Sequence, residues 1–115
     1  MPNRDVELLE LLYRRFNARD LPVILKMLHP DVTWANGMEG GHVRGREGVR
    51  HYWTQQWTMI DPRVEPAGFA TLADGGTEVE VQQTVRDLTG GLLSSKTVRH
   101  IFHIEDGLVT RFDIG

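Results

Sequence analysis

An imidazole and a carboxylate late in the sequence are the residues whose types and spacing suggest chemistry. The segment Thr97–Ile114 consists of two runs rich in β-branched and aromatic residues on either side of Asp106-Gly107. Asp-Gly between apolar runs is the strongest short-range signal for a two-residue hairpin loop, because both positions tolerate positive φ. Counting outward from that loop predicts the opposed pairs Glu105–Leu108, Ile104–Val109, Phe102–Arg111 and His100–Asp113.

Directly opposed residues of an antiparallel pair have Cβ atoms about 4.5–5.5 Å apart, so we expect His100 and Asp113 to lie within hydrogen-bonding reach. Desolvation raises the pKa of a partly buried carboxyl group, and a neighbouring imidazole can hold or relay its proton, which makes the pair a candidate general acid/base. The alternative is a cross-strand ion pair on a solvated or dimer-facing surface, contributing about 0.2–1 kcal/mol. His103 is expected on the other face of the hairpin, in the core, at an interface, or in a pocket if that face lines one.

Length and composition are those of one soluble globular domain. The chain has 115 residues, of which 40% are hydrophobic and 25% charged, so we expect a single domain over residues 1–115 with a real core. No stretch approaches the roughly 18 apolar residues that would span a bilayer, and acidic residues stand where a signal peptide needs an apolar segment. We therefore expect a cytoplasmic protein that does not enter a membrane.

The residue inventory narrows the chemistry and the partners. The sequence contains no cysteine, which excludes disulfides, thiol nucleophiles and thiolate metal sites. His29, His42 and His51 lack the H-x-H or H-x-x-x-H spacing of metal ligands, so we expect neither a metal nor a cofactor. The net charge is −3 and the basic residues are dispersed, which argues against nucleic acid. The expected partner is a small molecule or a protein.

Hydrophobic periodicity predicts three helices in the first half of the chain. Asp5–Ala18 is an amphipathic helix with apolar residues at spacings of three and four. A second, short helix begins at Leu21-Pro22, and His29-Pro30-Asp31 ends it because the residue before a proline leaves the helical region. The third helix follows Gly45–Gly48 and ends at Asp61-Pro62.

Period-two alternation and turn residues predict a sheet. Short strands are expected at Val32–Trp34 and Val43-Arg44, on either side of the glycine-rich segment 36–41. Longer strands are expected at 64–72, 78–85, 92–105 and 108–114, with tight turns between them. This order indicates an α+β fold in which three N-terminal helices pack on a curved, mainly antiparallel sheet.

Four local features resemble the SnoaL-like group of the NTF2-like superfamily, which includes polyketide cyclases, ketosteroid isomerases and limonene epoxide hydrolases. They are the segments Phe16–Leu21, Leu28–Trp34, Gly45–Trp53 and Asp106–Val109. The resemblance implies a cone, in which the curved sheet wraps around the long helix and encloses a ligand cavity at the wide end. It also implies a homodimer formed through the outer face of the sheet. The chemistry of this scaffold varies with its pocket residues, so the resemblance is specific for the fold and weak for the reaction.

The resemblance implies site residues most directly through the polyketide cyclases. These enzymes place an Asn on the first strand, a His on the penultimate strand and a catalytic Asp on the last, which implies Asn36, His100 and Asp113 here. A ketosteroid isomerase has its base carboxylate where Asn36 stands, and an amide accepts no proton at neutral pH. The tyrosine of that isomerase site also lacks a counterpart, since Tyr13 is one residue away from the required position. The Arg and two Asp of the epoxide hydrolases have no counterparts either.

Aromatic residues could line a cavity for a flat hydrophobic ligand. The alternative for each of them is a place in the core, because aromatic residues at helical spacing usually pack there. Gln83 interrupts a row of valines on one strand, and it is aimed either at a ligand or at the edge of a dimer face. The expected substrate-binding residues are Trp34, Tyr13, Phe16, Trp53 and Trp57, together with His103 if its face of the hairpin lines the pocket.

Two functions stay open on the sequence alone. The first is an enzyme without metal or cofactor that acts as a cyclase or isomerase on a small hydrophobic cyclic or polyketide-like carbonyl compound. In this enzyme Asp113 moves a proton, His100 positions or shares it, and Asn36 hydrogen-bonds the substrate oxygen as it gains enolate character. The second is a non-catalytic module of the same fold, in which the cavity holds a small hydrophobic ligand and the outer sheet face dimerises.

Overall fold

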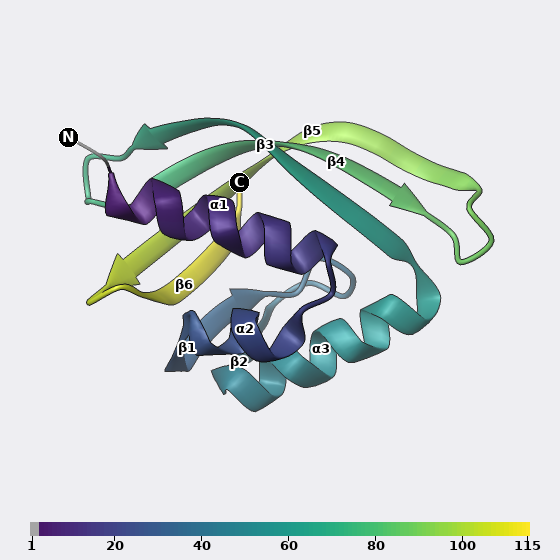
Figure 1. Cartoon of the computed structure of the whole chain (residues 1–115), viewed down its shortest axis with the longest axis horizontal. Helices are drawn as coiled ribbons and strands as arrows, with labels where there is room; N and C mark the ends of the chain where they lie inside the picture. Colours follow the sequence, from purple (N-terminus) through teal and green to yellow (C-terminus); the bar gives the residue numbers. More distant parts are fainter. Residues whose placement is uncertain (1–2) are drawn as a thin grey trace.

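Helices and one large sheet make up the computed structural model, which describes residues 3–115 (Figure 1). The order along the chain is α-helical at first and then β, interrupted only by the third helix. The elements are α1 (Arg4–Asn17), α2 (Leu21–Lys26), β1 (Leu28–Ala35), β2 (His42–Arg44), α3 (Gly45–Met59), β3 (Asp61–Thr71), β4 (Thr77–Arg86), β5 (Leu92–Glu105) and β6 (Leu108–Ile114). The predicted strands 92–105 and 108–114 are confirmed to the residue.

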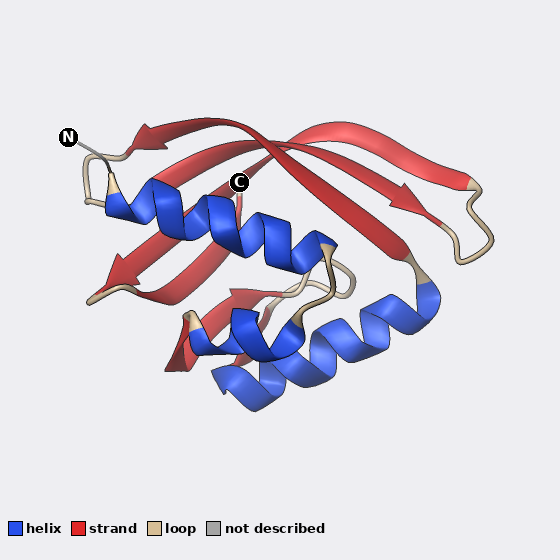
Figure 2. Ribbon diagram, viewed as in Figure 1, coloured by secondary structure: helices blue, strands red, loops and turns tan. Residues whose placement is uncertain are grey.

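The sheet has the strand order β2-β1-β6-β5-β4-β3. Strand β1 runs parallel to β6, and the other neighbouring strands are antiparallel. Figure 2 shows β3, β4 and β5 arching over α1, with α3 lying beneath the β1 and β2 end of the sheet. The predicted curved, mainly antiparallel sheet with packed helices is therefore what the chain forms.

Helix α1 forms where a capping residue precedes an apolar stripe. The side chain of Asn3 accepts hydrogen bonds from the backbone N–H groups of Asp5 and Val6, which satisfies two of the free donors at the helix start. The buried face then follows the spacing of three and four that the sequence shows, and it consists of Leu9, Leu12, Tyr13 and Phe16. This stripe lies against the concave side of the sheet.

The predicted end of the second helix is wrong. Helix α2 ends at Lys26, and β1 begins at Leu28 and continues through Pro30. Leu28 pairs with Val109 of β6, and the register of this parallel pair shifts before Thr33. Pro30 lies inside that irregular stretch, where its missing N–H interrupts no regular ladder. Asp61 and Pro62 likewise begin β3, where a helix end was expected.

The hairpin between β5 and β6 turns where the sequence predicts it, but its register is shifted. Asp106 and Gly107 have φ of 52° and 77°, which is the conformation of a tight two-residue loop. Pairing is regular up to Ile104–Val109, and the next pair is His103–Arg111, so Thr110 stands outside the ladder as a bulge. The Thr110 hydroxyl donates to the His103 carbonyl at 3.1 Å, which holds the bulge in place.

The bulge makes the predicted His100–Asp113 pair wrong. His100 lies opposite Ile114, while Asp113 lies opposite Ile101. Because successive side chains of a strand point to opposite faces, a shift by one residue places Asp113 on the outer face of the sheet. Phe112, which lies opposite Phe102, points inward with His100 instead.

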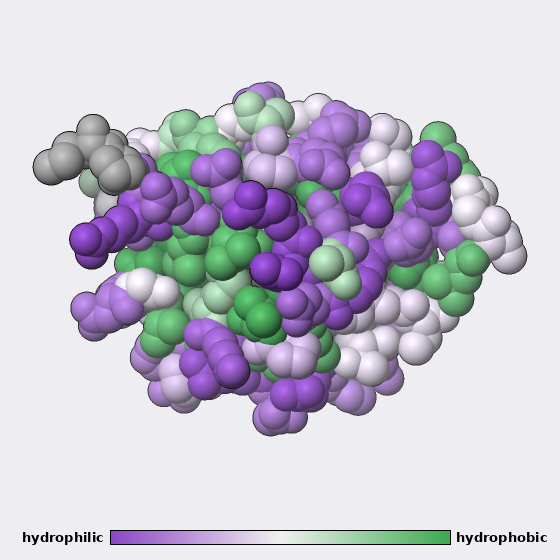
Figure 3. All heavy atoms as spheres, in the orientation of Figure 1, coloured by the Kyte–Doolittle hydropathy of each residue, from purple (hydrophilic) through white to green (hydrophobic). Residues whose placement is uncertain are grey.

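The β4–β5 hairpin extends beyond the helices as an arm (Figure 1). Its tip carries Leu88, Leu92 and Leu93, each more than half exposed, and apolar atoms are visible at that end of the molecule in Figure 3. The inner part of the same arm supplies residues to the cavity described below. Among residues 3–115, no helix has the length and apolar character needed to cross a membrane.

Asn17 joins the end of α1 to the edge strand β3. Its amide nitrogen donates to the Val64 carbonyl at 2.7 Å, and its amide oxygen accepts from the Val64 N–H at 2.9 Å. The side chain thus replaces a neighbouring strand at this position and fixes the distance between α1 and the sheet.

We expect Asn17→Ala to lower the free energy of unfolding by about 1–3 kcal/mol, because two partly buried backbone groups lose their partner. Urea denaturation followed by circular dichroism measures this change. Gln55→Ala, at an exposed position of α3, is the control. An unchanged midpoint for Asn17→Ala would contradict the bridging role.

Candidate functional site

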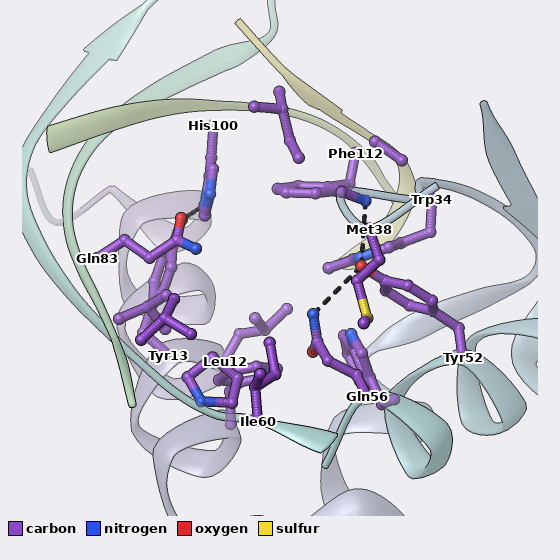
Figure 4. A pocket seen from close by; sticks show the side chains of 18 of the residues that line it. Leu12, Tyr13, Trp34, Met38, Tyr52, Gln56, Ile60, Gln83, His100 and Phe112 are labelled. Carbon is purple, nitrogen blue, oxygen red and sulfur yellow. Dashed lines mark hydrogen bonds between the residues drawn. The ribbon is translucent and has the colours of Figure 1, made fainter. Parts of the chain in front are cut away.

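A cavity of about 280 Å³ opens between α1, α3 and the concave face of the sheet (Figure 4). Most of the side chains that line it are aromatic or aliphatic, so it suits a largely apolar ligand. The aromatic lining residues are Tyr13, Phe16, Trp34, Tyr52, Trp53, Phe102 and Phe112. Strand β6 contributes Phe112 and Ile114 to this wall, because the bulge turns these two residues inward.

A buried histidine–tyrosine pair forms one side of the cavity. The Tyr13 hydroxyl oxygen lies 2.8 Å from His100 Nδ1, joining α1 to β5. His100 is only 8% exposed, and burial lowers its pKa to about 4 because the charged ring would lose its hydration. Burial raises the pKa of Tyr13 for the same reason. Both groups are therefore neutral near neutral pH.

The hydrogen-bond partners assign the tautomer of His100. The Tyr13 O–H needs an acceptor in this buried place, and among the described residues only His100 Nδ1 provides one. We infer from these contacts that Tyr13 donates to Nδ1 and that the proton of the neutral imidazole is on Nε2. That nitrogen has no hydrogen-bond partner within residues 3–115, and the imidazole lines the cavity. The pair thus presents one neutral N–H donor to whatever occupies the cavity.

Aromatic packing holds the His100 ring in this orientation. The ring is nearly parallel to that of Tyr13, with centroids 5.9 Å apart, and meets Phe112 edge to face at 4.8 Å. Phe112 in turn stacks on Trp34 at 4.2 Å, and Trp34 meets Trp53 of α3 edge to face at 5.1 Å. The donor is thus fixed by a chain of rings that crosses the cavity wall from β5 to α3.

A second polar group lies on the opposite side, on α3. The Tyr52 hydroxyl accepts a hydrogen bond from the Gly37 N–H at 3.1 Å and another from Gln56 Nε2 at 3.3 Å. Burial raises the pKa of Tyr52. Figure 4 shows Tyr52 and Gln56 facing His100 and Tyr13 across the cavity.

The family model of the SnoaL-like domain matches residues 9–112. The chain belongs to the SnoaL-like family. The match spans all nine elements from the first turns of α1 to β6, so the resemblance seen in the four local segments is confirmed. No curated protein sequence matches this SnoaL-like chain significantly.

Solved structures share the fold of this SnoaL-like protein. TerC, co-crystallised with polyporic acid, is 27% identical with a TM-score of 0.85, over 98% of this chain and 91% of TerC. An NTF2-like protein of unknown function from Burkholderia pseudomallei is 25% identical with a TM-score of 0.86, over 99% of this chain and 91% of that one. A putative polyketide cyclase from Sinorhizobium meliloti is 18% identical, over 100% and 95% of the two chains, and its TM-score of 0.81 shows the fold alone.

Asp113 does not reach the cavity of this SnoaL-like protein. On the outer sheet face its carboxylate accepts from Arg111 Nε at 2.7 Å and lies 2.8 Å from His42 Nε2. The hydrogen bond from Arg111 is the main cause that holds the pKa of Asp113 below its usual range; desolvation opposes this shift, and the hydrogen bond with His42 adds a smaller lowering effect. The alternative that the sequence left open, a cross-strand ion pair between Asp113 and His100, is therefore not formed either, because Asp113 has Arg111 of its own strand and His42 of β2 as partners.

Asn36 is also placed away from the cavity lining. Its side-chain oxygen accepts from the backbone N–H groups of Met38 and Glu39 at 3.0 and 2.9 Å, so it closes the turn after β1. The turn brings the neighbouring Gly37 and Met38 to the cavity instead. The three residues implied as catalytic are therefore not assembled, and only His100 faces the ligand space.

The expected substrate-binding residues divide into two groups. Four of them line the cavity, namely Tyr13, Phe16, Trp34 and Trp53. Trp57 instead packs on Phe16 and Trp53 outside the lining, and His103 lies on the outer face with Nε2 3.0 Å from Asp74.

Gln83 and Gln56 also line the cavity, although the sequence did not assign either residue to it. Gln83 takes the inward position in the β4 row of valines and lines the cavity, which agrees with its interpretation as a polar group aimed at a ligand. Gln56 stands in the apolar stripe of α3, and a polar residue in such a stripe was the available signal.

Among the described residues that line the cavity, none is Asp or Glu, and Lys96 carries the one formal charge. No group of three His, Asp or Glu within residues 3–115 is arranged to hold a metal ion.

The depressed pKa of His100 predicts a loss of stability in acid. Between pH 6.5 and about pH 4 the unfolded chain binds a proton at this imidazole that the folded chain excludes. The contribution is therefore complete above pH 6.5 and is lost as the pH falls towards 4, by about 3 kcal/mol at roughly 1.4 kcal/mol per pKa unit.

Urea unfolding at a series of pH values measures this slope. In the double variant Tyr13→Phe/His100→Phe the slope should be shallower, because the His100 imidazole is removed. Replacing both hydrogen-bond partners by apolar rings leaves neither one unpaired. His51→Gln, at an exposed position of α3, is the control. Equal slopes for the native chain and the double variant would refute the assignment.

Proposed function

We propose that this SnoaL-like protein binds a small hydrophobic carbonyl compound in the cavity and promotes a cyclase- or isomerase-type reaction on it. The observation that carries the proposal is the neutral His100, whose Nδ1 is held by Tyr13 at 2.8 Å and whose Nε2–H is free at the cavity wall. A carbonyl oxygen is the acceptor that fits such a donor. TerC, which is 27% identical and was co-crystallised with polyporic acid, supports a ligand of this kind.

The His100 N–H would act where negative charge develops. When a water molecule takes the proton from the carbon next to a carbonyl group and passes it to solvent, the carbonyl oxygen gains enolate character, and a fixed donor in an apolar cavity stabilises that charge strongly. Neutral imidazole serves this role in other enzymes, where a lowered pKa keeps it neutral. Tyr13 orients the ring, and its raised pKa opposes transfer of its own proton, so the pair stabilises charge by hydrogen bonding.

The geometry does not support Asp113 as the group that moves the proton, because its carboxylate is paired with Arg111 on the outer face. Asn36 likewise spends its side-chain oxygen on the turn after β1. Of the three residues that the sequence implied, only His100 keeps a role in the proposed reaction. Tyr13 acts as the positioning residue of His100. The homodimer implied by the resemblance stays a prediction.

A second function is a non-catalytic module that binds the same class of compound. The observation that favours it is the lining itself, which contains no carboxylate among the described residues and so offers no conventional base. The two functions share the binding step and differ in whether the bound carbonyl compound enolises.

Binding is tested with 1-tetralone, a flat two-ring ketone. Trp34 and Trp53 line the cavity, so quenching of tryptophan fluorescence reports its occupation. We expect the Tyr13→Phe/His100→Phe double variant to bind about threefold to tenfold more weakly, since one neutral hydrogen bond is lost. His51→Gln should bind like the native chain. Equal affinity of the native chain and the double variant would reject His100 as the carbonyl donor.

Enolisation is tested by NMR, as the exchange of the hydrogens next to the carbonyl group of 1-tetralone in heavy water. We expect the native protein to accelerate the exchange and the double variant to lose the acceleration. Asp113→Asn should keep it, because that carboxylate lies outside the cavity. Binding without faster exchange would select the non-catalytic module, and loss of exchange in Asp113→Asn would restore the proton-transfer role of Asp113.

A further inference from the structure

Strand β5 carries the one formal charge of the described cavity lining. Its lining residues are Ser94, Lys96, His100 and Phe102. They are separated by even numbers of residues and therefore share the concave face of the sheet, because side chains of a strand alternate between its two faces. Lys96 thus lies on the same face as His100, nearer to the arm. At about 3.3 Å per residue, their Cα atoms are at most roughly 13 Å apart along the strand.

Lys96 and His100 lie at different depths of the cavity. Three lining side chains are exposed, namely Met38, Lys96 and Ile114, and they mark the mouth where the cavity opens to solvent. His100 is buried. An ammonium group at the mouth keeps part of its hydration, so it costs little free energy there and still borders the apolar space. A ligand that reaches His100 can therefore have its other end at Lys96.

The charge of Lys96 is not neutralised by the described part of the chain. No carboxylate of residues 3–115 forms an ion pair with it. The residue directly opposite on β4 is the neutral Gln83, which also lines the cavity and lies on the same side of it as His100 in Figure 4. Opposed residues have Cβ atoms about 4.5–5.5 Å apart, so the amide offers a further N–H donor to a group bound at Lys96.

The sign of this charge is opposite to that of the whole chain. The net charge of the protein is −3, so the chain as a whole repels an anion. The described lining contains Lys96 and neither Asp nor Glu, so its own formal charge is positive. An anionic group is therefore stabilised at the mouth of the cavity by a local interaction, with no lining carboxylate to oppose it.

We propose that Lys96 binds a carboxylate group of the ligand at the mouth of the cavity. The apolar body of the ligand then lies inside, with its ketone oxygen at the His100 N–H. The substrate class is thus a hydrophobic keto acid in which an apolar body separates the ketone from the acid group. This assignment rests on the proposed binding of a carbonyl compound in the same cavity.

The test compares a keto acid with its uncharged amide. The probes are 6-carboxymethoxy-1-tetralone and the corresponding primary amide, which have the same number of heavy atoms and differ in charge. Quenching of tryptophan fluorescence gives both Kd values. We expect the native chain to bind the acid about fivefold more tightly at low ionic strength, as an ion pair at a partly exposed site allows. The preference should disappear in about 1 M salt, where the screening length is about 3 Å.

The sequence has two lysines, Lys26 and Lys96, which supply a matched pair of variants. Lys96→Met keeps an unbranched apolar stem and should bring the ratio of the two Kd values close to one. Lys26→Met changes the net charge by the same amount at an exposed position of α2 outside the lining, and should keep the native ratio. A native ratio near one, an unchanged ratio in Lys96→Met, or an equal loss in both variants would overturn the carboxylate site.

The Tyr13→Phe/His100→Phe double variant tests the proposed function separately, because it acts on the ketone end. It should weaken binding of acid and amide by the same factor and leave their ratio unchanged. If it does so while Lys96→Met also leaves the ratio unchanged, the carboxylate site is overturned and carbonyl binding stands. If the native chain binds neither probe, or the double variant binds both as well as the native chain, carbonyl binding fails and the keto-acid class fails with it.

Discussion

One extra residue in β6 determines which side chains of the last hairpin reach the cavity. Side chains of a strand alternate between its faces, so a single residue outside the ladder moves every later side chain to the opposite face. With Thr110 as that residue, Phe112 stacks on Trp34 inside the molecule and Asp113 pairs with Arg111 outside it. An apolar wall therefore stands where a regular hairpin would have placed a carboxylate.

The absence of a carboxylate from the described lining changes the character of the site. His100 and Tyr13 are both kept neutral by burial, and they satisfy each other except for one N–H. The inner part of such a cavity holds an uncharged group without requiring a counterion, and it favours any state of the ligand in which the oxygen of that group gains negative charge.

Local patterns in the sequence predicted the fold class and most of its elements. The spacing in α1, the Asp106-Gly107 loop and the alternation along β5 each depend on neighbouring residues, and each prediction agrees with the structure. The site depended on register, which is not local. Thr110 is an ordinary strand residue, and nothing beside it marks a bulge, so counting outward from the loop put Asp113 on the wrong face. Asn36 shows the same limit, since a turn and a ligand use its amide oxygen equally well.

The position of β6 also has a consequence for how the chain folds. This strand comes after all the others in the sequence, yet it lies between β1 and β5 in the sheet. Phe112 of β6 is there the register partner of Trp34 of β1. On the ribosome, β1 and β2 would emerge early, and β1 would lack its partner β6 until α3 and the strands β3, β4 and β5 have been synthesised. Pairings between such distant segments slow folding, so the interior that will hold the ligand is completed only when the final strand inserts.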